Sequence, residues 1–305
     1  MKKIASVFCV LALALASFTA AADQYELYPR GDVSEDGVVD IDDVSALINY
    51  LLTGKWPAIE TITVNGVSFK MIGVEGGTYM MGANPAIDGG DQTLDELPAH
   101  QVTVSSFSIG QTEVTQELWM AVMGYNQSYC SADYYWSDFE DDFQRPVENV
   151  SWKECKQFID SLNKLTGRHF RFPTEAEWEF AARGGNQSKG YKYAGSNNVD
   201  EVAWHQFNCY RLGLPTQPVA SKKPNELGLY DMSGNVDEWV QDWWSDYTEE
   251  AQVNPRGPYS GTKKVFRGGA WQIIQKWHRC ATRAADYDYV PVTFIGLRLA
   301  ESAPE

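Results

Sequence analysis

The stretch Asp32–Asp43 has oxygen-bearing residues at the spacing that wraps a chain around a hard cation. Its candidate ligands are the side chains of Asp32, Ser34, Asp36, Asp40 and Asp43, and the backbone carbonyl of Val38. Gly37 stands where the loop must turn sharply, which favours a residue without a Cβ. The pattern predicts a calcium loop in preference to a solvated acidic turn.

A second candidate cation loop is Gly228–Trp239, which combines carboxylates, an amide, glycines and a tryptophan. A turn at Gly234 can direct backbone carbonyls and nearby carboxylates toward one point. The bulky side chains of Trp243 and Trp244 follow, and with Trp239 they can anchor the loop in a core. Taken alone, this segment favours a plain Gly-Asn turn, so its interpretation depends on the rest of the chain.

The thiols and imidazoles have no spacing typical of a metal centre. The cysteines after the N-terminal segment are Cys130, Cys155, Cys209 and Cys280. They lack the paired spacing of zinc ligands, and in an oxidising compartment they allow several disulfide pairings. We interpret Cys155 as a small core residue. The histidines are His100, His169, His205 and His278, which form no close pair in sequence and favour surface or supporting positions.

The first residues have the features of a secretory leader. Lys2 and Lys3 precede an apolar run, Ile4–Phe18, and the small residues after it suit cleavage near Ala20 to Ala22. The run is too short to span a membrane. We therefore expect a signal peptide over 1–22 and an exported protein, whether periplasmic, on the cell surface or secreted. The net charge of -16 disfavours nucleic acid and anionic membranes as partners.

The remaining sequence divides into a small calcium module, 23–57, and a large domain, 58–305. A helix over Val44–Leu52 is expected to follow the calcium loop, with Gly54 and Pro57 ending it. Beyond it, alternating apolar runs such as Thr61–Phe69 and Gln101–Ile109 predict strands. The pattern indicates an irregular α+β domain with low regular secondary structure, stabilised by buried tryptophans.

Capping signals predict helices in the large domain. Thr115 is expected to cap a helix that carries Leu118 to Met123. Capping boxes predict two more helices, from Ser151 with Glu154 to Gly167, and from Thr174 with Glu177 to Gly184. The apolar face expected on the first of these two consists of Cys155, Phe158, Ile159, Leu162 and Leu165.

A set of motifs in a fixed order carries a family resemblance. The motifs are Gly76–Gly82, Gln111–Thr115, Arg145–Trp152, Arg171–Gly185, Gly228–Trp239, Phe266–Trp271 and Gly296–Ala300. Together they resemble the sulfatase-modifying-factor family, whose founding member is the formylglycine-generating enzyme. The resemblance covers the chain from about Val64 to Ala300 and implies an elaborated C-type-lectin-like fold. That fold has little regular secondary structure, in agreement with the irregular α+β class.

The resemblance also implies a structural calcium ion at the loop Gly228–Trp239. Matched by position, Asp231 and Glu238 would supply side-chain oxygens, and Gly234 and Val236 would supply backbone carbonyls. Asp231 stands where the family usually has asparagine. Because aspartate keeps an oxygen and adds charge, calcium remains the expected cofactor.

The enzyme of this family oxidises a sulfatase cysteine to formylglycine with O2 and a copper ion held by two thiolates. The resemblance places Cys280 at the second of these cysteines and Gln275 at the first. An amide is a poor ligand for Cu(I), which prefers soft sulfur donors. A copper oxidase with Cys280 as its catalytic thiol is therefore the alternative hypothesis, and copper a cofactor only if that alternative holds.

The loop Asp32–Asp43 resembles one repeat of a dockerin, a module that binds cohesin domains. It ends in Asp43 where most EF-hands have glutamate, and no entering helix is evident before it. A dockerin normally has two such repeats, and the sequence shows one. The single repeat weakens the expectation of a cohesin-like partner but leaves calcium binding unaffected.

We therefore expect a non-catalytic, calcium-stabilised binding or scaffold protein with an unknown protein or glycan ligand. The expected binding face lies within 272–294, and its side chains are Trp277, Arg279, Arg283, Tyr287, Tyr289 and Phe294. Aromatic side chains beside arginine suit recognition, although each of them can equally complete the core. A second candidate surface is Tyr134–Trp136 with the acids that follow it.

Overall fold

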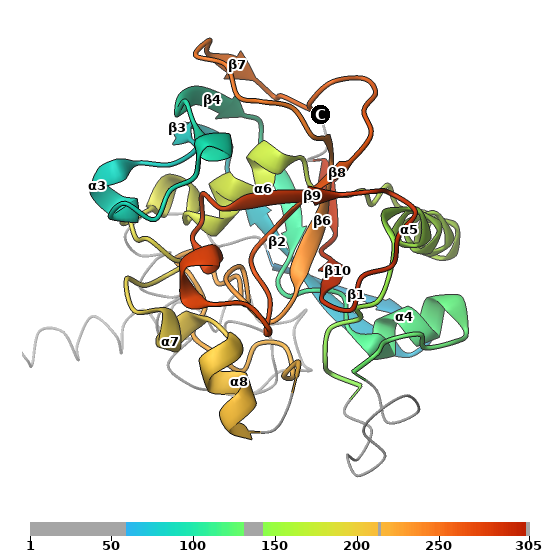
Figure 1. Cartoon of the computed structure of the whole chain (residues 1–305). Coiled ribbons are helices and arrows are strands. Elements are labelled where there is room, and N and C mark those ends of the chain that lie inside the picture. Colours follow the sequence, from blue (N-terminus) through green and yellow to red (C-terminus); the bar gives the residue numbers. More distant parts are fainter. Residues whose placement is uncertain (1–58, 131–142, 213–214, 303–305) are drawn as a thin grey trace, which may run out of the picture. The chain divides into compact units, whose positions relative to one another are not determined.

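The computed structural model describes residues 59–130, 143–212 and 215–302 (Figure 1). The chain divides into two compact units, Met1–Pro57 and Ala58–Glu305, and all described residues lie in the second. The predicted leader, the calcium loop Asp32–Asp43 with its helix, and the surface Tyr134–Trp136 lie outside the described residues and stay predictions. No helix in the described ranges combines the length and apolar character needed to cross a membrane.

An antiparallel sheet contains strands from both ends of the domain, in the order β1-β2-β5-β11. Its strands are β1 (Ile59–Val64), β2 (Val67–Val74), β5 (Phe107–Gly110) and β11 (Ala300–Ser302). The run Thr61–Phe69, predicted as one strand, is a hairpin instead. Asn65 and Gly66 both have positive φ, 49° and 86°, which is the geometry that two-residue hairpin turns require.

Two further sheets complete the strand content. One has the order β10-β6-β8-β9, with β10 (Ile295–Leu297), β6 (Asp237–Trp243), β8 (Lys264–Arg267) and β9 (Arg283–Asp286). The other has the order β3-β4-β7, with β3 (Gly77–Met81), β4 (His100–Val104) and β7 (Gln252–Val253). The run Gln101–Ile109 is therefore split between β4 and β5, which belong to different sheets.

Most of the helices are short. The helices are α3 (Pro85–Asp88), α4 (Gln116–Met123), α5 (Trp152–Thr166), α6 (Glu175–Ala182), α7 (Val199–Val202) and α8 (Gln206–Leu212). Of these, α6 lies among the strands of two sheets, against β3, β4, β6 and β8 (Figure 1). Short 3-10 turns are η3 (Leu94–Glu96), η4 (Gly185–Gln187) and η5 (Gln275–His278). The predicted Thr115 cap and both predicted capping boxes are confirmed. Gly167 ends α5 in the left-handed conformation, as expected.

Buried tryptophans join α4 to α5 and β6 to the segment before α5. Trp119 of α4 stacks on Phe158 of α5 at 5.0 Å, and the Trp239 indole of β6 donates to the Val150 carbonyl at 3.0 Å. Cys155 is buried, as predicted, whereas Leu165 at the end of α5 is 51% exposed and does not belong to the apolar face. The mixture of short helices, short strands and long loops confirms the predicted irregular α+β class.

Candidate ligand pocket

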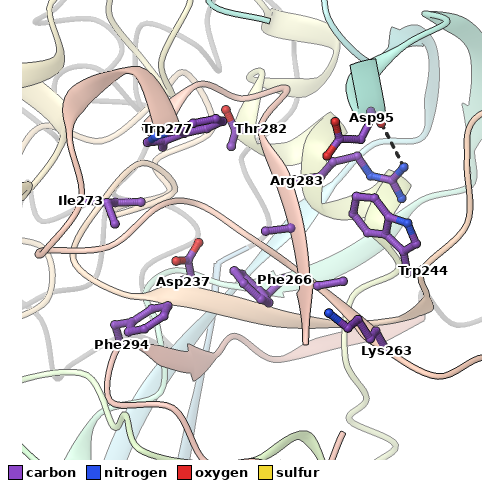
Figure 2. A pocket seen from close by; sticks show the side chains of 12 residues that line it. Asp95, Asp237, Trp244, Lys263, Phe266, Ile273, Trp277, Thr282, Arg283 and Phe294 are labelled. Carbon is purple, nitrogen blue, oxygen red and sulfur yellow. Dashed lines mark hydrogen bonds between the residues drawn. The ribbon is translucent and has the colours of Figure 1, made fainter. Parts of the chain in front are cut away.

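A pocket of about 550 Å³ lies where β6, β8 and β9 meet the loop between β8 and β9 (Figure 2). Its lining residues are Asp95, Asp237, Trp244, Lys263, Phe266, Ile273, Trp277, Thr282, Arg283, Ala284, Ala285 and Phe294. The volume falls within the range of small-molecule sites, and the walls combine aromatic rings with a few charged groups, as such sites commonly do. Of the predicted binding residues, the pocket brings together Trp277, Arg283 and Phe294.

Arg283 marks one end of the pocket, and its charge is already neutralised. Its Nε and Nη2 donate to the Glu175 carboxylate at 2.7 and 2.8 Å, and Nη1 donates to the carbonyls of Asp95 and Ser245. The guanidinium also lies 4.2 Å from the ring centre of Trp244. Arg283 is therefore part of the pocket wall, but its donors are occupied by protein acceptors.

Asp237 lies at the other end of the pocket, between Ile273, Phe266 and Phe294 (Figure 2). It is only 5% exposed, and its Oδ1 accepts from the Gly269 N–H at 2.8 Å. Burial raises the pKa of Asp237 to about 8, and the negative charge of Glu238 adds to this effect against the Gly269 hydrogen bond. The sequence reasoning named the segment but missed Asp237 as a pocket residue. Because successive side chains of a strand point to opposite faces, the sequence could have indicated that Asp237 and its neighbour Glu238 face different surroundings.

Arg279 is not part of an exposed binding face, and that prediction is wrong. Its side chain is fully buried. Its Nη1 donates to Asp88 at 2.9 Å and its Nη2 to Glu96 at 2.6 Å, so it joins α3 and η3 to the loop after η5. Arg279 is buried because it neutralises two buried acids, Asp88 and Glu96, from a distant part of the chain. The local sequence around Arg279 does not show this pairing.

Tyr287 and Tyr289 are exposed, as the binding-face prediction requires. They are 43% and 60% exposed, and their rings lie 5.6 Å apart. Lys263, which lines the pocket, places its ammonium 5.3 Å from the Tyr287 ring centre. The tyrosine pair does not line the pocket, but Lys263 connects the two features.

Cys280 is closed off from the pocket. It is buried, is absent from the pocket lining, and its thiol lies 3.7 Å from the Ala182 carbonyl oxygen. Burial raises the pKa of the Cys280 thiol to about 12, so the free thiol is protonated and a poor nucleophile at neutral pH. Gln275 lies on η5, and each of the described cysteines is unpaired. The residues present do not fit a two-thiolate copper site.

Two histidines meet in the core, although the sequence suggested no close pair. The rings of His205 and His278 lie 5.8 Å apart, and both residues are fully buried. His205 Nε2 lies 2.8 Å from Asp200 Oδ1. Burial lowers the pKa of His278 to about 4, and the neighbouring His205 contributes in the same direction. The pair therefore packs the core in its neutral form.

The predicted calcium loop Gly228–Trp239 runs into β6, is largely buried and contains several acids. Glu238 is held by Arg298 at 2.6 Å and accepts from the Trp178 indole at 2.7 Å. Asp231 Oδ2 accepts from the Ala220 N–H at 2.7 Å, whereas its buried Oδ1 has no hydrogen-bond partner among the described residues. Of the predicted ligands, Asp231 is thus the one whose placement favours a cation, while both oxygens of Glu238 are already engaged.

Glu113 adds a third carboxylate to this loop, and the sequence reasoning missed it. It accepts from the Val236 N–H at 3.2 Å and from the Asn235 amide at 3.1 Å. Burial, and then the negative charge of Asp231, raise its pKa well above the usual range. No group of three or more His, Cys, Asp or Glu side chains within the described ranges is arranged to hold a metal ion. Calcium at this loop stays a prediction that would depend on Asp231 and backbone carbonyls.

Comparison with known proteins identifies the family. Residues 59–303 match the sulfatase-modifying factor enzyme 1-like domain, and the chain belongs to this family. The chaperone protein LppX of Paenibacillus barcinonensis is 33% identical over 272 residues, which cover 73% of this chain and 86% of that protein. The mouse formylglycine-generating enzyme (Mus musculus) is 32% identical over 170 residues, 51% of this chain and 44% of the enzyme. The chain thus spans less than half of the length of that enzyme.

Solved structures show the same fold. Treponema denticola variable protein 1 superimposes with a TM-score of 0.71 at 32% identity, covering 81% of this chain and all of that protein. PvdO from Pseudomonas aeruginosa superimposes with a TM-score of 0.65 at 23% identity, covering 82% and 99%. The second likeness concerns the fold alone. Together they confirm the sulfatase-modifying-factor fold expected from the sequence motifs.

Proposed function

We propose that this chain is an exported, non-catalytic member of the sulfatase-modifying-factor family that binds a ligand in the pocket beside Trp277. One observation carries the proposal: Cys280 is buried and lies outside the pocket lining. A thiol must ionise and meet its metal or substrate to react, and neither condition suits a group with a pKa of about 12 in the core. The pocket nevertheless retains aromatic walls and charged groups that suit recognition.

The similar proteins support a binding role. One relative of this chain is named a chaperone, and chaperones act by binding other proteins. A solved structure at 32% identity is named a variable protein, a name that specifies no reaction. Members called formylglycine-generating enzymes share a smaller part of this chain, 51% for the mouse enzyme. Oxidation of a peptide cysteine is therefore the alternative that an experiment must exclude.

The test is aldehyde formation from a sulfatase-type cysteine peptide. The full mature chain is incubated with copper, O2 and the peptide, and the product is measured by mass spectrometry. A formylglycine-generating enzyme assayed in parallel shows that the conditions support turnover. We expect no aldehyde from this chain, and aldehyde that disappears in Cys280→Ser would overturn the proposal.

Export is the second part of the proposal, and the sequence of the first residues supports it. Lys2 and Lys3 with the apolar run Ile4–Phe18 are typical of a cleaved leader. Expression with the native N-terminus in a bacterial host, followed by mass measurement of the N-terminal peptide, tests it. The mature chain is expected outside the cytoplasm and to begin near Ala21. A full-length chain that stays in the cytoplasm would contradict export.

Calcium stabilisation is the third part. Asp231 Oδ1 is buried without a hydrogen-bond partner among the described residues. The carboxyl groups of Glu113 and Glu238 lie close enough to disfavour a negative charge on Asp231. With Arg298 as a buried cation among these acids, the cluster is still richer in carboxylates than in positive charge. A bound calcium ion would supply the missing charge. Asp231 and the carbonyls of Gly234 and Val236 would hold it.

A further inference from the structure

The acidic end of the pocket lacks a positive counterpart. Asp237 is 5% exposed and directs its carboxylate into the space between Ile273 and Phe294 (Figure 2). The ion pairs found within the described ranges do not include it, and the one charged side chain that contributes to its electrostatics is Glu238, of the same sign. Its polar contact in the protein is the Gly269 N–H at 2.8 Å. Burial without a cation disfavours the ionised form of this carboxyl group, and a cation bound against it would stabilise that form.

The basic side chains of the pocket do not fill this role. Arg283 lies beside Trp244 and is bound to Glu175 through two of its nitrogens. Lys263 is on the same side as Trp244, away from Asp237 (Figure 2). Its ammonium lies over the Tyr287 ring. Lys276 does not line the pocket, but its ammonium lies 4.7 Å from the ring centre of Trp277. Positive charge is therefore already present beside Trp244 and Trp277, whereas no cation in the part of the chain that the structure describes is paired with Asp237.

Aromatic rings form the walls around the acidic end. Phe266, Phe294 and Trp277 line the pocket, and all three are partly exposed to it. The face of an aromatic ring attracts a cation, and the attraction strengthens when water is excluded. A bare calcium or magnesium ion would instead require several oxygen ligands, which apolar walls cannot provide. The combination of one carboxylate and several rings selects an organic cation.

We propose that the pocket binds an organic cation, a primary ammonium or guanidinium group, against the Asp237 carboxylate and the rings of Phe266 and Phe294. The inference rests on the proposed binding function of this pocket and names its ligand class. The cation can come from a free amine or from a lysine or arginine side chain of a peptide. A volume of about 550 Å³ accommodates either of them.

The experiment compares charged and neutral probes that share a butyl chain on the full mature chain by isothermal titration calorimetry. The probes are n-butylammonium, n-butylguanidinium and the neutral 1-butanol, together with the blocked peptide Gly-Lys-Gly. Both cations are expected to bind at least about 10-fold more tightly than butanol, the discrimination that a charge-assisted hydrogen bond provides. A peptide that binds more tightly than butylammonium assigns the source as a basic side chain, and the reverse order assigns a free amine.

Matched variants locate the bound cation. Asp237→Asn keeps an oxygen for the Gly269 N–H and should lower cation affinity by about 10-fold or more, because it removes only the charge. Phe294→Leu, an independent change in the wall, should weaken the binding of the same cations, because it replaces an aromatic ring by an aliphatic side chain. Lys263→Met removes a positive charge, which repels a bound cation, from the other end of the pocket. This variant should bind the cations as tightly as the native chain or more tightly. Near-ultraviolet circular dichroism confirms that each variant is folded.

The outcomes distinguish this inference from the proposed function. Equal affinity for butylammonium and butanol, unchanged cation binding in Asp237→Asn, or no binding of any cation would overturn the organic-cation assignment. These binding results are independent of the aldehyde assay, so the non-catalytic proposal would stand as long as no aldehyde forms there. Aldehyde formation dependent on Cys280 would instead overturn the proposed function, whatever the cation probes show.

Discussion

Replacing Arg279 by methionine separates a structural from a binding role for this residue. The guanidinium is fully buried and bound to Asp88 and Glu96, which are themselves buried. Arg279→Met keeps much of the side-chain volume but leaves the two acids without their cation. Breaking a buried pair by removing one partner costs about 3–5 kcal/mol of the free energy of unfolding. For a domain of this size, that corresponds to a fall in Tm of about 6–20 °C.

The assay is thermal and urea unfolding of the full chain, followed by circular dichroism. Arg168→Met is the matched control, because Arg168 also pairs with two acids, Glu60 and Glu301, but is partly exposed. Exposed pairs contribute about 1 kcal/mol or less, so the control should change Tm little. If Arg279→Met unfolds like the control while cation binding falls, the buried-network interpretation is refuted and the original binding-face prediction is restored.

The remaining predictions concern the calcium loop and the histidine pair. The calcium test uses a background in which Asp32→Ala and Asp36→Ala disable the predicted N-terminal loop, so that the loop Gly228–Trp239 is tested alone. In this background saturating calcium, at about 100 times its Kd, should stabilise the chain by about 2.7 kcal/mol. This increment should vanish with Asp231→Ala but persist with the exposed-site control Asp246→Ala. An equal increment in both variants would place the ion elsewhere. Because the pKa of His278 is lowered to about 4, the unfolded chain takes up a proton first as pH falls, so stability should be lost between about pH 6.5 and 4. Between pH 7 and 4.5 the native chain should lose about 2 kcal/mol more than His278→Gln in urea titrations, and parallel curves would refute this. Gly234→Ala would place a Cβ 2.5 Å from a backbone oxygen, whereas Gly228→Ala meets nothing within 4 Å, although both glycines have positive φ. The first variant should therefore unfold at a lower urea concentration than the second, by more than the roughly 1 kcal/mol that positive φ alone costs a side chain.

Local signals were sufficient for α4, α5 and α6, whereas the shorter helices α3, α7 and α8 were not predicted. A helix start depends on a few adjacent residues, so Ser151 with Glu154 and Thr174 with Glu177 could be recognised in sequence. The hairpin at Asn65 was equally local, and its Asn-Gly turn could have divided the predicted strand. The irregular fold class followed from the same short-range patterns and from the ordered family motifs.

The pocket and the buried charged residues could not be predicted from such local signals. Arg279 looked like a surface residue because its partner Glu96 is distant in sequence and lies beside it only in the fold. His205 and His278 meet for the same reason, after a long intervening segment. Asp237 was overlooked because its segment was interpreted as a cation loop, while the strand turns this side chain toward the pocket. Partners far apart in sequence cannot be paired from periodicity alone.

The central claim is that Cys280, the cysteine that resembles the family's reactive thiol by its position, is sealed in the core. The rate of Cys280 alkylation tests this claim most directly. The native mature chain is treated with iodoacetamide at neutral pH with and without Cu(I), and the Cys280 peptide is quantified by mass spectrometry. The account predicts that Cys280 reacts only after unfolding in urea and that copper makes no difference. Rapid labelling of Cys280 in the folded chain, blocked by Cu(I), would contradict it.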